Sequence, residues 1–235
     1  MSKRSVFVVG GSRGIGLAIA NTFAASGDKV AVTYKSSEPP TGLFGVACDV
    51  TSEQSVEDAF AAVEAEQGQV EVLVYCAGIT RDRLTIRMSE ADWTEVLDTN
   101  LKGAFFATRK AIRRMMIAKK GRIVLVSSVV GLRGELGQTN YAASKAALVG
   151  LGRSLAREWG KSGVTTNIVL PGLTNTSMIE TIPKPELDKL IEQIPIRRVA
   201  EPEEVAAAVH FLASDLAASI NGACLAVDGG AATGH

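Results

Sequence analysis

Short runs of β-branched and other apolar residues alternate along this chain with longer stretches of helical periodicity. This alternation is typical of βαβ units, in which helices cover both faces of a parallel sheet. We expect strands at residues 5–9, 29–33, 43–48, 70–75, 121–127, 164–170 and 223–227. We expect helices near residues 15–26, 52–67, 92–119, 140–161 and 202–213. The sequence therefore predicts an α/β fold with a doubly wound, seven-stranded parallel sheet.

Length and charge favour one domain without a global preference for a charged partner. The 235 residues suit one α/β domain, and no linker, internal repeat or low-complexity stretch divides them. The 25 basic and 25 acidic residues cancel, so we expect no nucleic acid or membrane partner. The apolar run from Val6 to Val9 is too short for a membrane span or a signal-peptide core.

The cysteines, Cys48, Cys76 and Cys224, are widely spaced and form no CxxC pair. This spacing argues against a disulfide framework and against a zinc site. We therefore expect no bound metal and a reducing compartment, the cytoplasm.

Glycines follow the first predicted strand and open the first predicted helix, in the segment Gly10-Gly11-Ser12-Arg13-Gly14-Ile15-Gly16. Glycine lets the backbone come close to a pyrophosphate, and a helix N-terminus supplies unpaired N–H groups and a positive dipole end. The spacing G-x-x-x-G-x-G differs from the general dinucleotide fingerprint G-x-G-x-x-G, so a purely structural turn is an alternative. Its position at the first βα junction favours nucleotide binding.

Tyr141 and Lys145 lie one helical turn apart at the start of the predicted helix 140–161, and Ser128 ends the strand before it. The i, i+4 spacing places the phenol and the ammonium on one helix face. An ammonium favours the phenolate, so we expect Lys145 to lower the pKa of Tyr141 towards neutrality and make it a general acid. Alone, Ser128 could be a turn residue and Tyr141 a core aromatic; together they favour proton transfer.

The order of six motifs resembles the short-chain dehydrogenase/reductase family, and the resemblance covers essentially the whole chain. The motifs are the glycine segment, Cys76-Ala77-Gly78, Thr99-Asn100-Leu101, Ser128, Tyr141-Ala-Ala-Ser-Lys145 and Pro171-Gly172. The resemblance implies a Rossmann-type fold, with residues 1–235 forming a single NADP(H)-binding reductase domain.

Within the family, the chain is most similar to the 3-oxoacyl-[acyl-carrier-protein] reductases. The stretches that carry this likeness are Ile79-Thr80-Arg81-Asp82, Gly121-Arg122-Ile123, Ser128-Val129-Val130-Gly131 and Val227-Asp228-Gly229-Gly230. Residues 42–46 and the Gly234-His235 ending also resemble the branch that acts on long, mycolate-type acyl chains. The resemblance implies NADPH-dependent reduction of 3-oxoacyl thioesters on acyl carrier protein to 3-hydroxyacyl thioesters, in fatty-acid or polyketide synthesis. Two alternatives are a dehydrogenase for a free alcohol, sugar or steroid, and a catalytically silent nucleotide-binding scaffold.

The resemblance also implies a role for each catalytic residue. Tyr141 would protonate the alkoxide that develops as hydride arrives, and Ser128 would hydrogen-bond to the substrate carbonyl. Lys145 would hold the nicotinamide ribose, and Asn100 would help to position Lys145 through water. Asn100 could instead be a helix-interior amide bonded to the backbone.

Cys76 departs from the family pattern, which usually has asparagine at this position. The asparagine side chain bonds to the backbone, whereas a thiol is a weak donor and acceptor. We interpret Cys76 as a small, buried, apolar side chain.

Cofactor choice depends on the residues after the second predicted strand, where NAD enzymes place an acid and NADP enzymes a cation. No acid stands in Val32-Thr33-Tyr34-Lys35. Lys35 and Arg13 could both meet a phosphate, so we expect NADPH/NADP+, although each could be a solvated surface cation. The resemblance implies further cofactor contacts at Gly10, Ser12, Gly14, Ile15, Gly16, Asp49, Val50, Ala77, Gly78, Tyr141, Lys145, Pro171, Gly172, Thr174 and Thr176.

Residues 173–200 interrupt the alternation with Pro183, Pro185 and Pro195 around a short amphipathic segment. We interpret this region as an excursion from the sheet edge that acts as a substrate lid. The expected substrate contacts are Ser128, Leu136, Tyr141 and Leu173. Met178, Ile182 and other apolar residues of the region suit an acyl chain, but their helical spacing could equally serve packing.

A basic cluster near the end of the predicted helix 92–119 comprises Arg109-Lys110, Arg113-Arg114 and Lys119-Lys120. Carrier proteins are acidic, so we expect acyl carrier protein to dock at Arg113 and Arg114. The helix dipole also favours cations there without any partner. Helices 92–119 and 140–161 have broad apolar faces, and the resemblance implies that they pair between subunits of a homotetramer.

Overall fold

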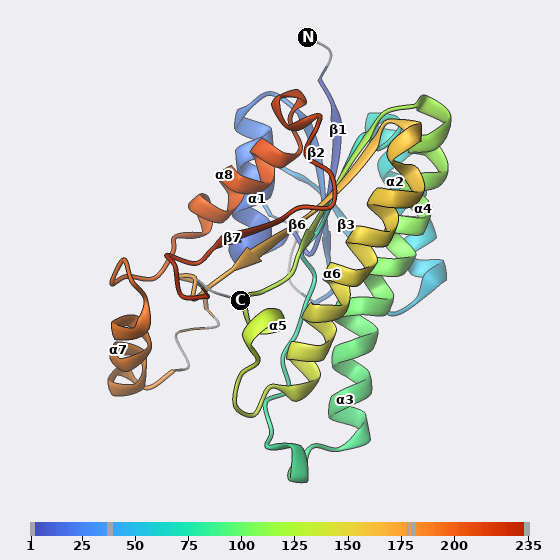
Figure 1. Ribbon diagram of the computed structural model, residues 1–235. Helices are drawn as coiled ribbons and strands as arrows, with labels where there is room; N and C mark the ends of the chain where they lie inside the picture. The colour runs from blue at the N-terminus through green and yellow to red at the C-terminus, as the bar shows by residue number, and fades with distance from the viewer. Residues whose placement is uncertain (1–2, 37–39, 178, 180–181, 233–235) are drawn as a thin grey trace.

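The computed structural model describes residues 3–36, 40–177, 179 and 182–232. Within these residues, seven parallel strands form one sheet (Figure 1). They are β1 (Ser5–Val9), β2 (Lys29–Tyr34), β3 (Phe44–Ala47), β4 (Val72–Tyr75), β5 (Gly121–Val126), β6 (Val164–Pro171) and β7 (Cys224–Val227). Their order is β3-β2-β1-β4-β5-β6-β7, so the winding direction reverses between β1 and β4. The predicted Rossmann-type, doubly wound parallel sheet is confirmed, and ligands bind such sheets beside the reversal point.

Helices cover both faces of the sheet (Figure 1). On one face lie α1 (Gly14–Ala25) and α8 (Pro202–Leu212); on the other lie α2 (Glu53–Gln67), α4 (Gly103–Ala118) and α6 (Thr139–Trp159). The shorter helices are α3 (Glu90–Leu97), α5 (Val130–Arg133) and α7 (Lys184–Gln193). None of the helices in the described ranges is long and apolar enough to cross a membrane.

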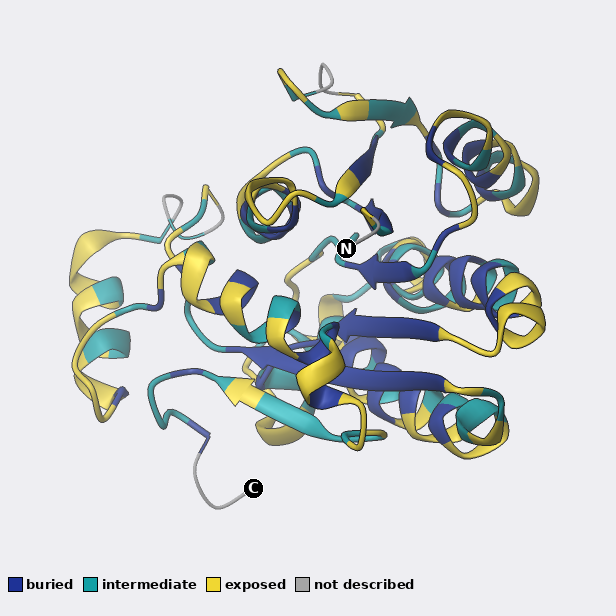
Figure 2. Cartoon of the chain, turned by 90° about the horizontal axis from the view of Figure 1, so that it is seen from above, coloured by how far each residue is buried: buried dark blue, intermediate teal, exposed yellow. Residues whose placement is uncertain are grey.

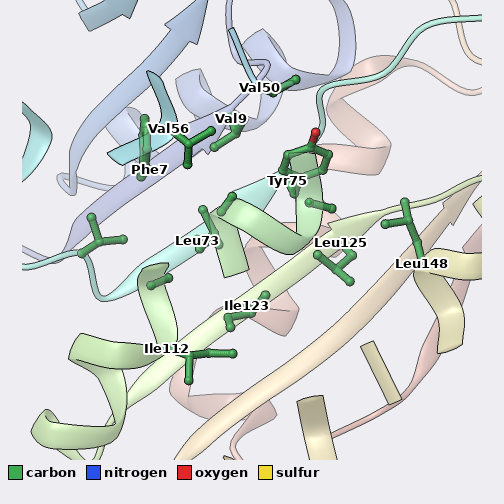
Figure 3. Close-up of a cluster of buried hydrophobic side chains, with 14 of the residues drawn as sticks. Phe7, Val9, Val50, Val56, Leu73, Tyr75, Ile112, Ile123, Leu125 and Leu148 are labelled. Atoms are coloured by element: carbon green, nitrogen blue, oxygen red, sulfur yellow. The ribbon is translucent and has the colours of Figure 1, made fainter. Parts of the chain in front are cut away.

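Apolar, mainly β-branched strands form the core because parallel strands are buried on both faces. Phe7, Leu73 and Ile123 pack towards α2, α4 and α6, in one cluster that also contains Ile112 of α4 and Leu148 of α6 (Figure 3). The neighbouring positions on these strands, such as Val8 and Val74, pack towards α1 and α8. Figure 2 shows buried central strands between helices that expose their outer faces. This rigid sheet positions the loops at its carboxyl edge.

The predicted helix 92–119 is divided in the structure. α3 ends at Leu97, a π-helical segment spans Asp98–Lys102, and α4 begins at Gly103. Such π segments often occur at functional sites, and this one contains the buried Asn100. Helical periodicity continues on both sides of the segment, so the sequence did not reveal it.

The excursion predicted for residues 173–200 follows β6 and contains α7, which stands apart from the sheet (Figure 1). Every residue of α7 is exposed or half-buried. Backbone bonds from Ala200 N to Leu173 O (2.9 Å) and from Asn175 N to Ala200 O (2.8 Å) close the base of the excursion. Met178, predicted to line it, lies outside the described residues, as do residues 234–235.

Candidate active site

The carboxyl ends of four adjacent strands bring the predicted site residues to one edge of the sheet. The glycine turn follows β1, Ala77 and Gly78 follow β4, and Ser128 follows β5. Pro171 ends β6, with Gly172 directly after it. Because parallel strands all end at the same edge, residues far apart in sequence become neighbours there.

Residues at the end of β5 bind Lys145 of α6 through both its side-chain amine and its backbone carbonyl. The Lys145 side chain is buried, and its Nζ donates to the Val126 carbonyl at 2.9 Å. The Ser127 hydroxyl donates to the Lys145 carbonyl at 2.7 Å. A Cβ on Gly131 would lie 2.8 Å from the Lys145 carbonyl carbon, so only glycine permits this approach of α5 to α6. The ammonium therefore has a fixed position.

Tyr141 lies between Lys145 and Ser128. The Lys145 Nζ lies 5.6 Å from the centroid of the Tyr141 ring, and the Tyr141 side chain hydrogen-bonds to Ser128. Ser128 is buried, and its Oγ accepts from Val130 N at 3.2 Å. The predicted association of these three side chains is present in the structure.

The expected lowering of the Tyr141 pKa by Lys145 is wrong for the chain alone. Burial raises the pKa of Tyr141 to about 12, although the hydrogen bond with Ser128 opposes this rise. Burial also lowers the pKa of Lys145 to about 8. Loss of water disfavours both charged forms, and here this cost exceeds the attraction between the two groups. The free protein therefore keeps Tyr141 as a protonated phenol at neutral pH.

Asn100 is fully buried and bonded by both ends of its amide. Its Oδ1 accepts from Ile79 N at 2.9 Å, and its Nδ2 donates to Ile79 O at 3.1 Å and to Ser144 Oγ at 3.0 Å. The alternative of an amide bonded to the backbone thus describes its contacts. A Cβ on Gly78 would lie 3.3 Å from Lys145 Nζ and 3.4 Å from Asn100 Oδ1, so both atoms border the same small space. A role of Asn100 towards Lys145 through water stays a prediction.

Cys76 is half-buried and packs with the apolar cluster beneath α1 and α8. Burial raises the pKa of its thiol to about 11, and the positive charge of Lys145 opposes this rise. The thiol is therefore neutral, in agreement with the apolar interpretation. Its electrostatic interaction with both Lys145 and Tyr141 was not anticipated from the sequence.

The glycine turn fits a dinucleotide pyrophosphate. Gly10 has φ +83°, and a Cβ on it would lie 2.5 Å from Ala77 N. A Cβ on Gly16 would collide with the Gly10 carbonyl oxygen. Among the described residues, no side chain caps the N-terminus of α1, whereas Ser52 caps α2. The turn thus has tight backbone packing and leads into a helix N-terminus without a side-chain cap, as an approaching phosphate requires.

Lys35 and Asp49, both predicted to contact the cofactor, form an ion pair at 2.8 Å. This hydrogen bond to Lys35, with a second to Thr51, lowers the pKa of Asp49 to about 2. Val50 beside them is buried, and Arg13 is exposed at the glycine turn. A phosphate bound by Lys35 would therefore compete with Asp49 for the ammonium.

The segment after β6 returns to the glycine turn. A Cβ on Gly14 would lie 3.5 Å from Thr176 Cγ2, so these two predicted cofactor residues are neighbours. Thr174 is buried, and its hydroxyl donates to Gly172 O at 3.0 Å. Ser12 and Ile15 of the turn are half-buried. Most of the predicted cofactor residues therefore surround the ends of β1, β4 and β6.

The predicted substrate and docking residues have weaker support from geometry. Leu136 is 83% exposed on the loop before α6, and Leu173 is half-buried. Arg114 forms an ion pair with Glu64 of α2 at 3.7 Å, and Arg109 is paired with Glu53 of the same helix. Acids of α2 thus neutralise part of the basic cluster. Arg113 is exposed and forms no ion pair with any residue that the structure describes.

Sequence reasoning missed the polar contacts that join the loop after β4 to the start of α6. Gln138 Nε2 donates to Asp82 Oδ2 at 2.8 Å, and the hydroxyls of Thr85 and Thr139 are 2.7 Å apart. Asn140, which directly precedes Tyr141, is fully buried in the same region. The signal available in the sequence was a run of polar residues immediately before a candidate catalytic tyrosine.

Comparisons with known proteins agree with this geometry. A family model described as enoyl-(acyl carrier protein) reductase matches residues 9–232. The 3-oxoacyl-[acyl-carrier-protein] reductase MabA of Mycobacterium avium is 50% identical over 232 residues, which are 99% of this chain and 91% of that protein. MabA of Mycobacterium tuberculosis (strain ATCC 25618 / H37Rv) is 49% identical, over 99% of this chain and 94% of that protein. The 3-oxoacyl-[acyl-carrier-protein] reductase FabG of Escherichia coli (strain K12) is 42% identical over 95% of each chain. This chain belongs to the short-chain dehydrogenase/reductase family.

Proposed function

We propose that this protein reduces 3-oxoacyl thioesters on acyl carrier protein to 3-hydroxyacyl thioesters, with NADPH as hydride donor. The observation that carries this proposal is the hydrogen-bonded pair of Ser128 and Tyr141 beside the buried Lys145, at the carboxyl edge of the sheet. The MabA and FabG relatives, whose names state this activity, support the same reaction.

The chemistry suits a carbonyl oxygen. A bound nicotinamide supplies hydride to the carbonyl carbon, and negative charge then develops on the oxygen. The hydroxyls of Ser128 and Tyr141 are close enough to each other to donate to one such oxygen, and Tyr141 gives its proton to it. Lys145 places a positive charge beside the phenolate that remains. The raised pKa of Tyr141 keeps the proton available until the alkoxide forms.

The nucleotide-binding residues support a phosphorylated dinucleotide. The glycine turn and the N-terminus of α1 would bind the pyrophosphate, and Asp49 and Val50 would flank the adenine. β2 ends without an acid at Tyr34, and the adjacent Lys35 would bind the 2′-phosphate together with Arg13. We infer NADPH from these cations.

Enoyl reduction is a second candidate because the matching family model is described by that activity. It would deliver hydride to a carbon–carbon double bond. The pairing of two hydroxyl groups favours the carbonyl instead, since both can stabilise charge on a single oxygen. The intact Ser128, Tyr141 and Lys145 also argue against a silent scaffold.

One assay tests the proposal. Purified protein is mixed with NADPH and either acetoacetyl-acyl carrier protein or crotonyl-acyl carrier protein. In a third reaction, the protein is mixed with NADP+ and a free secondary alcohol. The absorbance of NADPH is followed in each reaction. We expect rapid NADPH consumption with the acetoacetyl substrate and little change with the others. Faster reaction of the crotonyl substrate would establish an enoyl reductase, and reaction of the alcohol alone would establish a dehydrogenase for free substrates.

The acyl chain length is a separate question. The values of kcat/KM for a series of 3-oxoacyl-acyl carrier proteins with increasingly long acyl chains would report the preferred length. A rise with length would support residues 173–200 as the cover of the acyl chain, because the apolar residues Leu187, Leu190 and Ile191 of that region are half-buried. A preference for the shortest substrate would contradict this lid.

A further inference from the structure

Asn140 is a fully buried amide that neither proton transfer nor cofactor binding accounts for. It lies in the first turn of α6, directly before Tyr141. Its Nδ2 donates to the carbonyls of Arg81 and Asp92, both at 3.1 Å. Its Oδ1 accepts from Tyr141 N at 2.8 Å. Both amide hydrogens and the amide oxygen are therefore bonded to backbone groups.

These bonds join three parts of the chain. Arg81 belongs to the loop after β4, Asp92 to α3, and Tyr141 to α6. Exposed contacts between the same loop and the start of α6 surround this amide, such as the bond between Thr85 and Thr139. Asn140 is the buried centre of the junction, where water competes least for its hydrogen bonds.

The backbone of Tyr141 is bonded on both sides. The first N–H groups of a helix lack acceptors within the helix, and Asn140 supplies one for Tyr141 N. On the other side, Ser144 Oγ donates to Tyr141 O at 2.7 Å, and Asn100 Nδ2 donates to Ser144 Oγ at 3.0 Å. The first turn of α6 is thus tied to the loop after β4 by Asn140 and to the π segment by Asn100.

We propose that Asn140 is a positioning residue, which orients the first turn of α6 so that the Tyr141 hydroxyl stays hydrogen-bonded to Ser128. Ser128 follows directly after β5, so the contact depends on how α6 sits against the sheet. A tilt of the first turn would separate the two hydroxyls without touching the glycine turn. This inference rests on the proposed function, in which Tyr141 is the acid.

The test compares two buried asparagines. Asn167 of β6 is also fully buried, its Nδ2 donates to Ile220 O at 2.8 Å, and its Oδ1 accepts from Ala223 N at 3.0 Å. Asn140→Ala and Asn167→Ala therefore remove the same kind of buried backbone contact, and both should unfold more easily than the parent. Only Asn140→Ala should lower kcat, by about 10- to 100-fold, because small displacements of a reacting group cost rates of this order. The KM for NADPH should stay near the parental value.

The pH profile gives a second readout. In the reverse direction, oxidation of a 3-hydroxyacyl thioester requires Tyr141 as the phenolate. The hydrogen bond to Ser128 lowers the pKa of Tyr141, so its loss should lower the oxidation rate of Asn140→Ala throughout the alkaline range in which the parental rate rises with pH. Asn167→Ala should keep the parental profile.

Asn140→Asp is the conservative variant and serves if Asn140→Ala does not fold. It keeps the shape and the acceptor for Tyr141 N, but an ionised carboxylate cannot donate to the carbonyls of Arg81 and Asp92. We expect kcat and the pH profile of oxidation to change in the same direction in Asn140→Asp as in Asn140→Ala. Equal kcat and equal pH profiles in the Asn140 and Asn167 variants would overturn the positioning role and leave a structural one. A parent without activity on acetoacetyl thioesters would instead overturn the proposed function itself.

Discussion

Burial decides the ionisation of the two central side chains, Tyr141 and Lys145. Burial shifts both groups towards the uncharged form, because it raises the pKa of the phenol to about 12 and lowers that of the ammonium to about 8, yet the ammonium still predominates at neutral pH. Lys145 is charged below its pKa and Tyr141 is protonated over the whole neutral range. The free protein is therefore prepared for reduction at neutral pH, with proton and positive charge both present.

The lowered pKa of Lys145 predicts how reduction depends on pH. A lysine with a lowered pKa loses its charge earlier as pH rises, so kcat/KM for reduction should be level below about pH 8 and fall above it, by about tenfold per pH unit. Tyr141 adds no fall in this range because it stays protonated. Rates measured from about pH 6 to about pH 10 would check this. A level profile up to the highest pH would show that the charge of Lys145 is not required or that its pKa is not lowered.

Cofactor preference should depend on Lys35 and Arg13. Loss of one charge-assisted phosphate contact costs about 1.5–3 kcal/mol, which is about 10- to 100-fold in binding. Lys35→Ala and Arg13→Ala should each weaken the binding of NADPH by this factor and leave the binding of NADH almost unchanged, because only NADPH has the 2′-phosphate. Titration of both cofactors into each variant measures the change. Equal efficiency of NADPH and NADH in the parent would contradict the assignment.

At the scale of elements, α4 tests the docking of acyl carrier protein. Arg113→Glu with Arg114→Glu should raise KM for a carrier-bound substrate, because exposed cations mainly speed encounter with an acidic partner. The effect should weaken with added salt, which screens charges beyond about 8–10 Å. An N-acetylcysteamine thioester uses the same catalytic residues without a carrier and is the control. If both substrates respond alike, the carrier protein docks elsewhere, and the role of Arg114 is its ion pair with Glu64.

The sequence was sufficient for the elements whose pattern is local and repeated. β1, β4 and β5 were predicted from their apolar β-branched runs, and the glycine turn was located by its place between β1 and α1. The π segment around Asn100 was not predictable, because the sequence is helical in pattern on both sides of it, in α3 and in α4. Tertiary pairing was also hidden: Asn140 meets Arg81 and Asp92 only once the loop after β4 folds onto α6.

Charged residues show the same difference between what is local in the sequence and what depends on the tertiary structure. Ser128, Tyr141 and Lys145 could be identified from their spacing, but the direction of the Tyr141 pKa could not, since it depends on how much water the folded site excludes. The basic cluster was visible in the sequence. Its partial neutralisation by α2 was not, because Glu53 and Glu64 are separated from Arg109 and Arg114 by about 50 residues or more.

At the scale of the whole molecule, the homotetramer stays a prediction, in which partner subunits would cover exposed apolar residues of α4. Phe105 is 44% exposed and Ile117 is 72% exposed, both on α4. We expect light scattering to report a tetramer for the parent. Phe105→Asp should shift the protein towards smaller species, because a carboxylate would be buried without a partner. A parent that is monomeric at every concentration would contradict the prediction.

In the proposed function, the whole fold places one acid, Tyr141, at the substrate carbonyl. Tyr141→Phe keeps the ring and removes the proton, so turnover of acetoacetyl-acyl carrier protein should fall by at least about 10²-fold, the usual scale of general acid catalysis. NADPH binding, measured by fluorescence titration of the same preparation, should remain close to the parental value because the glycine turn is unaltered. We expect lost turnover with retained NADPH binding, and near-parental turnover in Tyr141→Phe would contradict the proposed role of Tyr141 as the acid.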